Sequence, residues 1–306
     1  MAARPLVAVG IIQQGDRIVP ALTSADRDTF ARQGYLHVRG CIPAARIEAM
    51  TTVIDQVVDT ESRGMLAAGE IDDLATAQPF ERRWYHVWRQ HGGKQQFGQV
   101  GWHSRVFSRA LFDLWVEPSI LDTVEALIGP EIQFNGDFWV RPKLPDEQET
   151  TLPWHQDSGY MPDTADHPLL TLWMPLVEVN ADNGTLQFVP GSQKMGIQDH
   201  GTADGSFRTT AFDPAAGAAI DTVAMSPGDF VLFDNLVFHR STVNCADMVR
   251  WSIDFRYSPV GTPMAHLWHA DMAFTARSRR DPSQAATWQQ VEHAWQHSRQ
   301  RRERAW

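Results

Sequence analysis

The sequence predicts a double-stranded β-helix, or jelly roll, in which two antiparallel β-sheets form the core and helices cover it. Helical periodicities and helix-ending glycines occupy residues 23–130, whereas residues 131–260 consist of short alternating runs separated by turn residues. Helices first and many short strands afterwards are typical of this architecture. We expect all 306 residues to form one domain, with helical support at 23–130, the jelly-roll core at 131–260 and a C-terminal helix at 275–306.

Composition narrows the class of protein. The formal charge is 27 minus 37, or −10, which disfavours nucleic acid and anionic membranes as partners. No stretch approaches the run of about 20 apolar residues that spans a bilayer, and we identify no signal peptide. Cys41 and Cys245 are the only cysteines, so no disulfide framework is expected and Cys245 should be an inert thiol. We therefore expect a cytoplasmic protein, monomeric or homodimeric.

Helix signals dominate the first third of the chain. Residues 1–22 should be a loosely ordered lead-in, followed by a helix that Thr23 or Ser24 caps and Gly34 ends. Tyr35–Val38 should form a strand. A second helix should begin at Pro43 and pack on something large and flat, because one stripe of it is apolar: Ile47, Met50, Ile54, Val57 and Val58.

Residues 61–103 mix polar segments with aromatic ones and show no clear period. The Gly92-Gly93 pair favours a mobile connection, so this segment is either a lid or entrance loop or an ordinary packed excursion. A helix from Pro118 to Ile128, ended by Gly129-Pro130, closes the helical part.

The strand pattern begins at Ile132–Lys143, which places a polar row on one face: Gln133, Asn135, Asp137, Trp139 and Arg141. That row faces either a pocket or solvent at a sheet edge. Asn183-Gly184 predicts a hairpin. Further strands are expected at Leu169–Val177, Leu186–Val189, Gly228–Asp234, Val237–Arg240 and Val249–Tyr257.

His155 and Asp157 are two residues apart, so in an extended strand their side chains share one face. A second histidine beside them would complete the 2-His-1-carboxylate triad that binds non-heme Fe(II) and leaves positions open. The alternative is a surface strand with two polar residues facing water. His239 is the best candidate for the third ligand, because it follows a turn and a buried strand at residues 225–234.

Arg250 lies in a strand whose alternate members Trp251, Ile253 and Phe255 are apolar, so its own face should point into the barrel. A buried arginine needs an anion, because an unpaired buried charge costs several kcal/mol. That anion could be a structural carboxylate, Asp229 or Asp254, or the far end of a dicarboxylate co-substrate held by the planar guanidinium.

Several motifs in order resemble the phytanoyl-CoA dioxygenase family of Fe(II)- and 2-oxoglutarate-dependent oxygenases. The likeness extends from about Thr23 to Tyr257. It is carried by His155-Gln156-Asp157, Trp173, Asn183-Gly184-Thr185-Leu186, Pro190-Gly191-Ser192, Gly228-Asp229, His239 with Ser241, and Arg250.

This resemblance implies a cupin-like fold and assigns roles to named residues. His155, Asp157 and His239 should bind iron, and Arg250 should hold the distal carboxylate of 2-oxoglutarate with Ser241 as a helper. Trp173 matches a position that lines the co-substrate pocket, and Gln156 is the usual middle residue of its motif. Asn135 and Gln133 compete as the polar contact from the preceding strand.

The implied activity is hydroxylation or another oxidation of a small-molecule metabolite, with O2 consumed and succinate and CO2 released. The family's halogenases replace the Asp157 carboxylate with a small residue, so its presence favours oxidation. A free metabolite, in secondary metabolism, fits better than a coenzyme A thioester because no basic groove is evident. Two other functions stay open: a jelly-roll metalloenzyme that does not use 2-oxoglutarate, and a non-catalytic barrel that only binds.

Other polar residues are candidates for lesser roles. His266 and His269 with Asp271, and His167 beside Asp166, are rival metal ligands that lack the surrounding motifs. Residues 61–103, 161–168 and 199–220 should border the substrate pocket, since loops at the mouth of such barrels vary with substrate. An acidic group of the substrate could bind one of three arginines: Arg141, Arg208 or Arg256.

Overall fold

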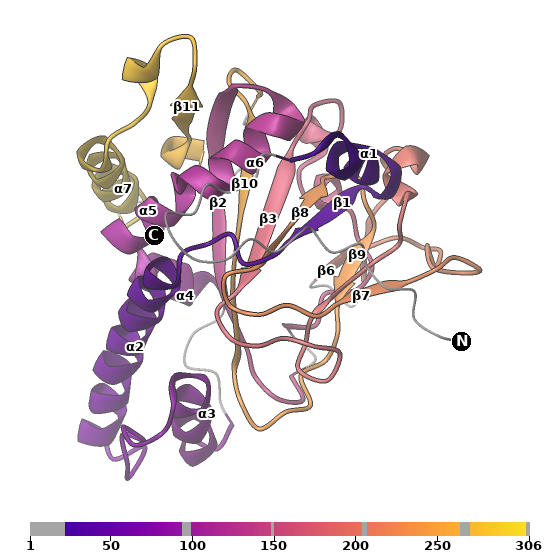
Figure 1. Ribbon diagram of the computed structural model, residues 1–306. Helices are drawn as coiled ribbons and strands as arrows, with labels where there is room; N and C mark the ends of the chain where they lie inside the picture. Colours follow the sequence, from indigo (N-terminus) through magenta and orange to yellow (C-terminus); the bar gives the residue numbers. More distant parts are fainter. Residues whose placement is uncertain (1–21, 94–98, 148–149, 204–206, 264–269, 304–306) are drawn as a thin grey trace.

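A computed structural model describes residues 22–93, 99–147, 150–203, 207–263 and 270–303 (Figure 1). Two antiparallel sheets form its core, as the sequence predicts, and helices from the first half of the chain cover the larger sheet. The expected lead-in at 1–22 lies almost wholly outside the described residues. No helix among the described residues is long and apolar enough to cross a membrane.

The first helix begins and ends at capping residues. Thr23 caps the first helix through a capping box with Asp26, and Gly34 ends it in the left-handed conformation at φ +82°. Both features were predicted. The helices are α1 (Ser24–Gln33), α2 (Ala44–Ala67), α3 (Phe80–Gln90), α4 (Gln99–Val106), α5 (Arg109–Trp115), α6 (Pro118–Ile128) and α7 (Trp288–Glu303).

The larger sheet has the strand order β1-β8-β3-β10-β2-β11, and the smaller has the order β7-β4-β9. A separate pair, β5 and β6, forms a small ribbon. The larger sheet contains β1 (Tyr35–Val38), β2 (Glu131–Lys143), β3 (Leu170–Pro175), β8 (Phe230–Asp234), β10 (Arg250–Pro259) and β11 (Phe274–Ser278). The other strands are β4 (Leu186–Phe188), β5 (Gly201–Ala203), β6 (Phe207–Thr209), β7 (Asp221–Val223) and β9 (His239–Ser241).

Strand β2 lies inside the larger sheet, between β10 and β11, so it is not the solvent-facing edge that the sequence left open. Its pairing with β10 shifts register where Asn135, Gly136 and Asp137 face one residue of the partner. Gly136 has φ +87°, a conformation that favours glycine, and the Asn135 side chain accepts a hydrogen bond of 2.9 Å from the Asp137 N–H. This bulge places Asp137 toward the space between the sheets.

Two predictions about turns and termini are wrong. Asn183-Gly184 does not join paired strands, because β3 belongs to the larger sheet and β4 to the smaller one; the turn carries the chain between sheets. The segment from Thr275 is not helical at its start: Phe274–Ser278 is a strand that pairs with β2, and the helix begins only at Trp288. Tertiary pairing outweighs local propensity here.

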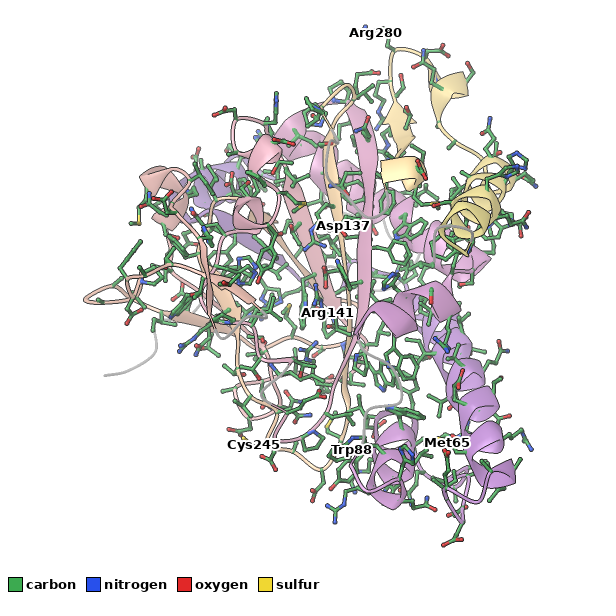
Figure 2. The ribbon with its side chains drawn as sticks, turned by 180° about the vertical axis from the view of Figure 1, so that it is seen from behind. Met65, Trp88, Asp137, Arg141, Cys245 and Arg280 are labelled. Carbon is green, nitrogen blue, oxygen red and sulfur yellow. The ribbon has the colours of Figure 1, made fainter. Side chains whose placement is uncertain are left out.

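The helix α2 was expected to pack on something large and flat, and its main neighbours are three other helices, α3, α4 and α5 (Figure 1). Residues 61–103 are largely helical, and Trp84 and Trp102 are buried and stacked edge to face, with Trp102 also against Trp251. The described part of this segment is therefore packed against the rest of the protein and is not a lid. Figure 2 shows Met65 of α2 and Trp88 of α3 at one end of the molecule, away from Asp137 and Arg141 in its middle.

The Asp229 carboxylate fixes the loop that leads into β8. It accepts hydrogen bonds from the N–H groups of Gly40, at 2.7 Å, and Ser226, at 3.1 Å, and lies 3.2 Å from Nε2 of His37. Burial opposes ionisation of this carboxyl, but the His37 contact and the backbone hydrogen bonds hold its pKa below the usual value. Asp229 is thus a structural residue that ties β1 to β8, and it is not the anion that Arg250 requires.

We predict that Asp229→Ala lowers the free energy of unfolding at pH 7 by about 2 kcal/mol, because two backbone donors lose their acceptor. Urea denaturation measures this change, with the exposed Asp28→Ala as the matched control. The folded pKa is depressed, so the contribution is present above the unfolded value of about 3.9 and is lost as the pH falls through the folded pKa. An equal loss of stability at pH 7 in both variants would contradict this role.

Candidate active site

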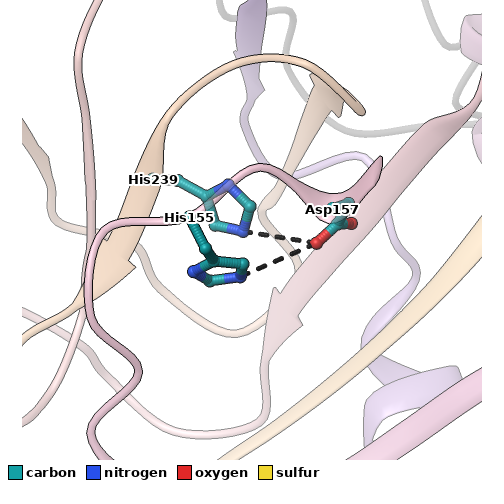
Figure 3. Close-up of side chains that lie close together, drawn as sticks. All are labelled: His155, Asp157 and His239. Carbon is teal, nitrogen blue, oxygen red and sulfur yellow. Dashed lines mark ion pairs between the residues drawn. The ribbon is translucent and has the colours of Figure 1, made fainter. Parts of the chain in front are cut away.

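His155 and His239 are neighbours through a short antiparallel bridge between the two segments. The N–H of each residue donates to the carbonyl of the other at 3.0 Å, and their ring centroids lie 4.1 Å apart. Asp157 opens a short 3-10 turn, Asp157–Gly159, so the predicted continuous strand is interrupted there. The two-residue spacing still brings both side chains to one point. One carboxylate oxygen of Asp157 lies 3.8 Å from Nε2 of His155 and 3.6 Å from Nε2 of His239 (Figure 3).

Both imidazoles are oriented by the backbone. Nδ1 of His155 lies 2.8 Å from the Pro153 carbonyl and Nδ1 of His239 lies 3.1 Å from the Val237 carbonyl, so each Nδ1 carries the proton that it donates. Each Nε2 is then an acceptor that faces Asp157. Burial lowers the pKa of both rings, and for His155 the charge of His239 adds to the effect. Both histidines are therefore neutral near pH 7, which is the form that binds metals.

The Asp157 carboxylate stays ionised although it is buried. Burial raises its pKa, but the charge of Arg256 and the hydrogen bond from the Thr171 hydroxyl lower it by more, so the net shift is downward. The carboxylate oxygen that points away from the histidines accepts hydrogen bonds from the Thr171 hydroxyl and from Arg256, the latter at 3.3 Å. The other oxygen is left to face the two imidazoles.

Arg256 is surrounded by three buried carboxylates. Its guanidinium contacts Asp254 at 2.6 Å, Asp137 at 3.1 Å and Asp157 at 3.3 Å. Asp254 also accepts from Nε of Arg141 at 2.5 Å. Arg256 thus pairs with three protein carboxylates, which favours a structural role over the predicted one of receiving an acidic group of the substrate.

The three donors fit a divalent metal ion. The donor atoms of His155, Asp157 and His239 lie within 4.8 Å of one another and all three residues are buried; among the described residues they form the one such group. Two ligands that are each about 2.1 Å from one ion are about 3 to 4 Å apart, as the Asp157 oxygen is from each of the two histidine nitrogens. Two neutral imidazoles and one carboxylate are the donor set of non-heme iron(II) sites.

The triad opens into a cavity of about 340 Å³ between the two sheets. The predicted residues Arg250, Ser241 and Trp173 line it together with the triad. The guanidinium of Arg250 lies over the Trp173 ring, 5.3 Å from the centroid. The remaining lining includes Asp137, Trp139, Arg141, Lys143, Thr150, Leu152, Tyr160, Met161, Thr171, Leu186, Phe233, Asp254 and Arg256.

Two residues predicted to bind the co-substrate do not line this cavity. Asn135 stabilises the β2 bulge, and Gln133 donates to the Thr262 carbonyl. The Gln156 amide donates to the carbonyls of Gly196 and Leu236 and accepts from the Gln198 N–H, so it holds the 196–200 segment behind the triad. Of the loops expected to border the pocket, the start of 161–168 does so, whereas the described residues of 61–103 and 199–220 contribute none of the lining.

The rival metal ligands receive no support. His167 forms no metal-binding group with neighbouring acids, and His266 and His269 lie outside the described residues. The side chain of Arg208 is likewise outside the described part of the chain. Cys245 is exposed and lies at the periphery in Figure 2, and its inertness stays a prediction.

Sequence reasoning missed Asp137, Thr171 and Lys143 as parts of the site. The polar row of β2 was a signal for Asp137, since Trp139 and Arg141 of the same row also face the cavity. Lys143 continues that row by one more step of two residues, but a lysine near a predicted strand end is usually exposed. Thr171 carried no signal of its own, because threonine is common in strands.

The sequence is similar to those of known oxygenases. The sequence model of phytanoyl-CoA dioxygenase (PhyH) matches residues 30–252. The 1-deoxypentalenic acid 11-beta-hydroxylase of Streptomyces arenae is 26% identical over 255 residues, covering 78% of this chain and 83% of that protein. Peroxisomal phytanoyl-CoA dioxygenase of Homo sapiens is 23% identical over 248 residues, covering 78% of this chain and 68% of that protein.

Solved structures share the fold. The non-heme monooxygenase ThoJ in its apo form has a TM-score of 0.60 and 20% sequence identity, covering 91% of this chain and 96% of that chain. The epimerase SnoN in complex with Fe3+, alpha ketoglutarate and nogalamycin RO has a TM-score of 0.50 and 21% identity, covering 82% of this chain and 84% of that chain. The two-sheet architecture is therefore that of a cupin-like jelly roll.

We predict that Arg256→Met lowers the free energy of unfolding by about 3 to 5 kcal/mol, because three buried carboxylates lose their shared cation. Urea denaturation at pH 7 gives the value, and Arg39→Met, at an exposed position, is the matched control. Adding Asp137→Asn to Arg256→Met should restore part of the loss, because it removes one of the carboxylates left without a partner. Stability equal to that of the wild type would contradict the proposed charge balance.

Proposed function

Because the chain belongs to the phytanoyl-CoA dioxygenase family, we propose that His155, Asp157 and His239 bind its iron and that Arg250 holds the distal carboxylate of 2-oxoglutarate. The observation that carries this proposal is the convergence of three buried donor atoms within 4.8 Å. Ser241 and Trp173 lie in the same cavity as Arg250 and complete the co-substrate end.

The protein is an Fe(II)- and 2-oxoglutarate-dependent oxygenase that acts on a small molecule. Hydroxylation is the outcome we propose, supported by the intact Asp157 carboxylate and by the name of the Streptomyces arenae relative. We also propose a role in secondary metabolism, in line with the description of SnoN as an epimerase from nogalamycin biosynthesis. A metalloenzyme without 2-oxoglutarate is less well supported, since Arg250 is buried at the cavity and forms no ion pair with a described residue.

The chain's own residues position the reactants and exclude water. Bound iron(II) would supply the activation of O2 coupled to decarboxylation of 2-oxoglutarate to succinate and CO2. The Pro153 and Val237 carbonyls fix the two histidine rings, and Arg256 with Thr171 fixes the Asp157 carboxylate. Because these contacts are buried, the ligands need little rearrangement when the metal binds.

The substrate would occupy the part of the cavity away from Arg250. Tyr160 is 37% exposed and lies edge to face with the His155 ring at 5.4 Å, which places it at the mouth. Arg141 stacks on Trp139 at 5.1 Å and keeps 18% of its side chain exposed. An aromatic wall beside a partly exposed guanidinium supports an apolar metabolite with an acidic group, and free rather than bound to coenzyme A.

Three further expectations from the sequence remain proposals. We propose that the 306 residues form a single domain, that the protein works as a monomer or homodimer, and that it resides in the cytoplasm. The net charge of −10 supports an activity that does not involve nucleic acid.

We predict that Asp157→Ala abolishes iron(II) binding and iron-dependent turnover, because it removes the single anionic donor of the triad. Anaerobic calorimetric titration with Fe(II) measures binding, and Asp166→Ala, an exposed carboxylate nearby, is the control. Since Asp157 also pairs with Arg256, His239→Gln provides a second test that leaves this pair intact. Iron binding at the wild-type level in both site variants would remove the triad from consideration.

Substrate-dependent release of succinate tests the proposed activity itself. Purified enzyme with Fe(II), O2 and 2-oxoglutarate should release succinate faster when a true substrate is added. We predict that carboxylic acids stimulate release more than their methyl esters, because the ester removes the charge that Arg141 would contact. Mass spectrometry of the product should show one added oxygen atom, and turnover without succinate would favour an enzyme that does not use 2-oxoglutarate.

A further inference from the structure

Lys143 and Arg250 form a pair of like charges that faces the cavity. They are directly opposite each other in the antiparallel pairing of β2 and β10. Both residues are buried, with 1% and 2% of their surface exposed, and both line the cavity. Like charges directly opposite on neighbouring strands destabilise a sheet, and burial increases the cost. Such a pair requires an explanation beyond folding.

Among the described residues, neither cation forms an ion pair. Nζ of Lys143 donates to the Ser241 hydroxyl at 2.8 Å. Arg250 donates to the Ser252 hydroxyl, and its Nε is buried without a partner. Asp254, the nearest carboxylate along β10, is bound to Arg141 and Arg256. This contrasts with Arg256, which three carboxylates surround in the same cavity.

Ser241 links the lysine to the cavity. Its hydroxyl oxygen accepts from Lys143 and also from the Leu152 N–H at 3.2 Å. With both acceptor positions used, the hydroxyl hydrogen remains to be donated, which suits an anion. The lysine stem passes over Gly184, where an added Cβ would lie 2.8 Å from Cδ of Lys143. The left-handed Gly184, at φ +92°, therefore leaves room for the stem to reach Ser241.

The unpartnered pair also affects protonation. Burial and then the charge of Arg250 lower the pKa of Lys143 to about 6, against a smaller opposing effect of Glu147. Burial and then the charge of Arg141 lower the pKa of Arg250 to about 9, against a smaller opposing effect of Asp254. At a pKa of about 6 the Lys143 amine is largely neutral near pH 7, and an anion that enters beside it would favour the protonated form.

We propose that Lys143 is a second cation for the distal carboxylate of 2-oxoglutarate, acting beside Arg250 and positioned by Ser241. This inference rests on the proposed function, in which Arg250 marks the co-substrate end of the cavity. Arg250 alone would supply one charge to that carboxylate; with Lys143 the pocket supplies two, together with the Ser241 hydroxyl. The pair therefore sets the enzyme's preference for a dicarboxylate over a 2-oxo acid that lacks the second carboxylate.

The test compares two ligands and two lysine variants. Lys143→Met keeps an unbranched stem and removes the charge, whereas Lys194→Met makes the same change at an exposed lysine far along the chain. Each protein is loaded with Fe(II) without oxygen and titrated by calorimetry with 2-oxoglutarate. 2-Oxobutanoate, which keeps the 2-oxo acid and lacks the distal carboxylate, is then measured by its competition with 2-oxoglutarate.

We expect Lys143→Met to weaken 2-oxoglutarate binding about 10- to 100-fold, the range for losing a charged hydrogen bond. Binding of 2-oxobutanoate should change little, and Lys194→Met should match the wild type for both ligands. Thermal unfolding without ligand should show Lys143→Met at least as stable as the wild type, because a buried unpaired charge is removed. 2-Oxoglutarate should raise its unfolding temperature less than that of the wild type.

Two results would overturn the role of Lys143 while leaving the proposed function intact. One is equal affinity of the wild type and Lys143→Met for 2-oxoglutarate. The other is an equal loss for both ligands, which would indicate a packing defect and not contact with the distal carboxylate. If instead the wild type binds Fe(II) but neither ligand, the proposed use of 2-oxoglutarate fails, and the assignment of Lys143 fails with it.

Discussion

The register of β10 is the constraint on which the site depends. This strand lies between β2 and β3, and its alternate residues Arg250, Asp254 and Arg256 line the cavity while Trp251 and Phe255 pack in the core. A shift of one residue would turn every one of these side chains to the opposite face. The large aromatic residues make that shift very costly, so the packing of the core fixes the position of each charge in the site.

Charge in the cavity is consequently divided into two regions. Around Arg256, three carboxylates meet two arginines, and these cations hold Asp157 ionised with one oxygen directed at the histidines. Around Arg250 and Lys143 the described residues supply positive charge without an ion pair. The first region has one carboxylate in excess, which suits a cation, whereas the second is stabilised by an anion. The cavity therefore has a metal-binding end and an anion-binding end.

Much of this could be predicted from the sequence, because the relevant signals are local. The spacing of His155 and Asp157, the alternation of β10 and the capping residues Thr23 and Gly34 each depend on near neighbours in the chain. Family resemblance assigned roles to His239 and Arg250, and both line the same cavity as the first two residues. The predicted boundaries of elements were wrong where strand pairing determines them. Phe274–Ser278, for example, is a strand because it pairs with β2.

What the sequence could not reveal depends on partners across the sheets. Asparagine is a residue type that often binds ligands. The Asn135 side chain instead stabilises a bulge, and this bulge exists only because β2 pairs with β10. Lysine is a residue type that is usually exposed. The same pairing places Lys143 opposite Arg250, and Gly184 leaves room for its side chain to reach Ser241. One register therefore removes a predicted ligand from the cavity and adds an unpredicted cation to it. The motif residues define the chemistry of this site, and the cross-strand neighbours determine which anion it can hold.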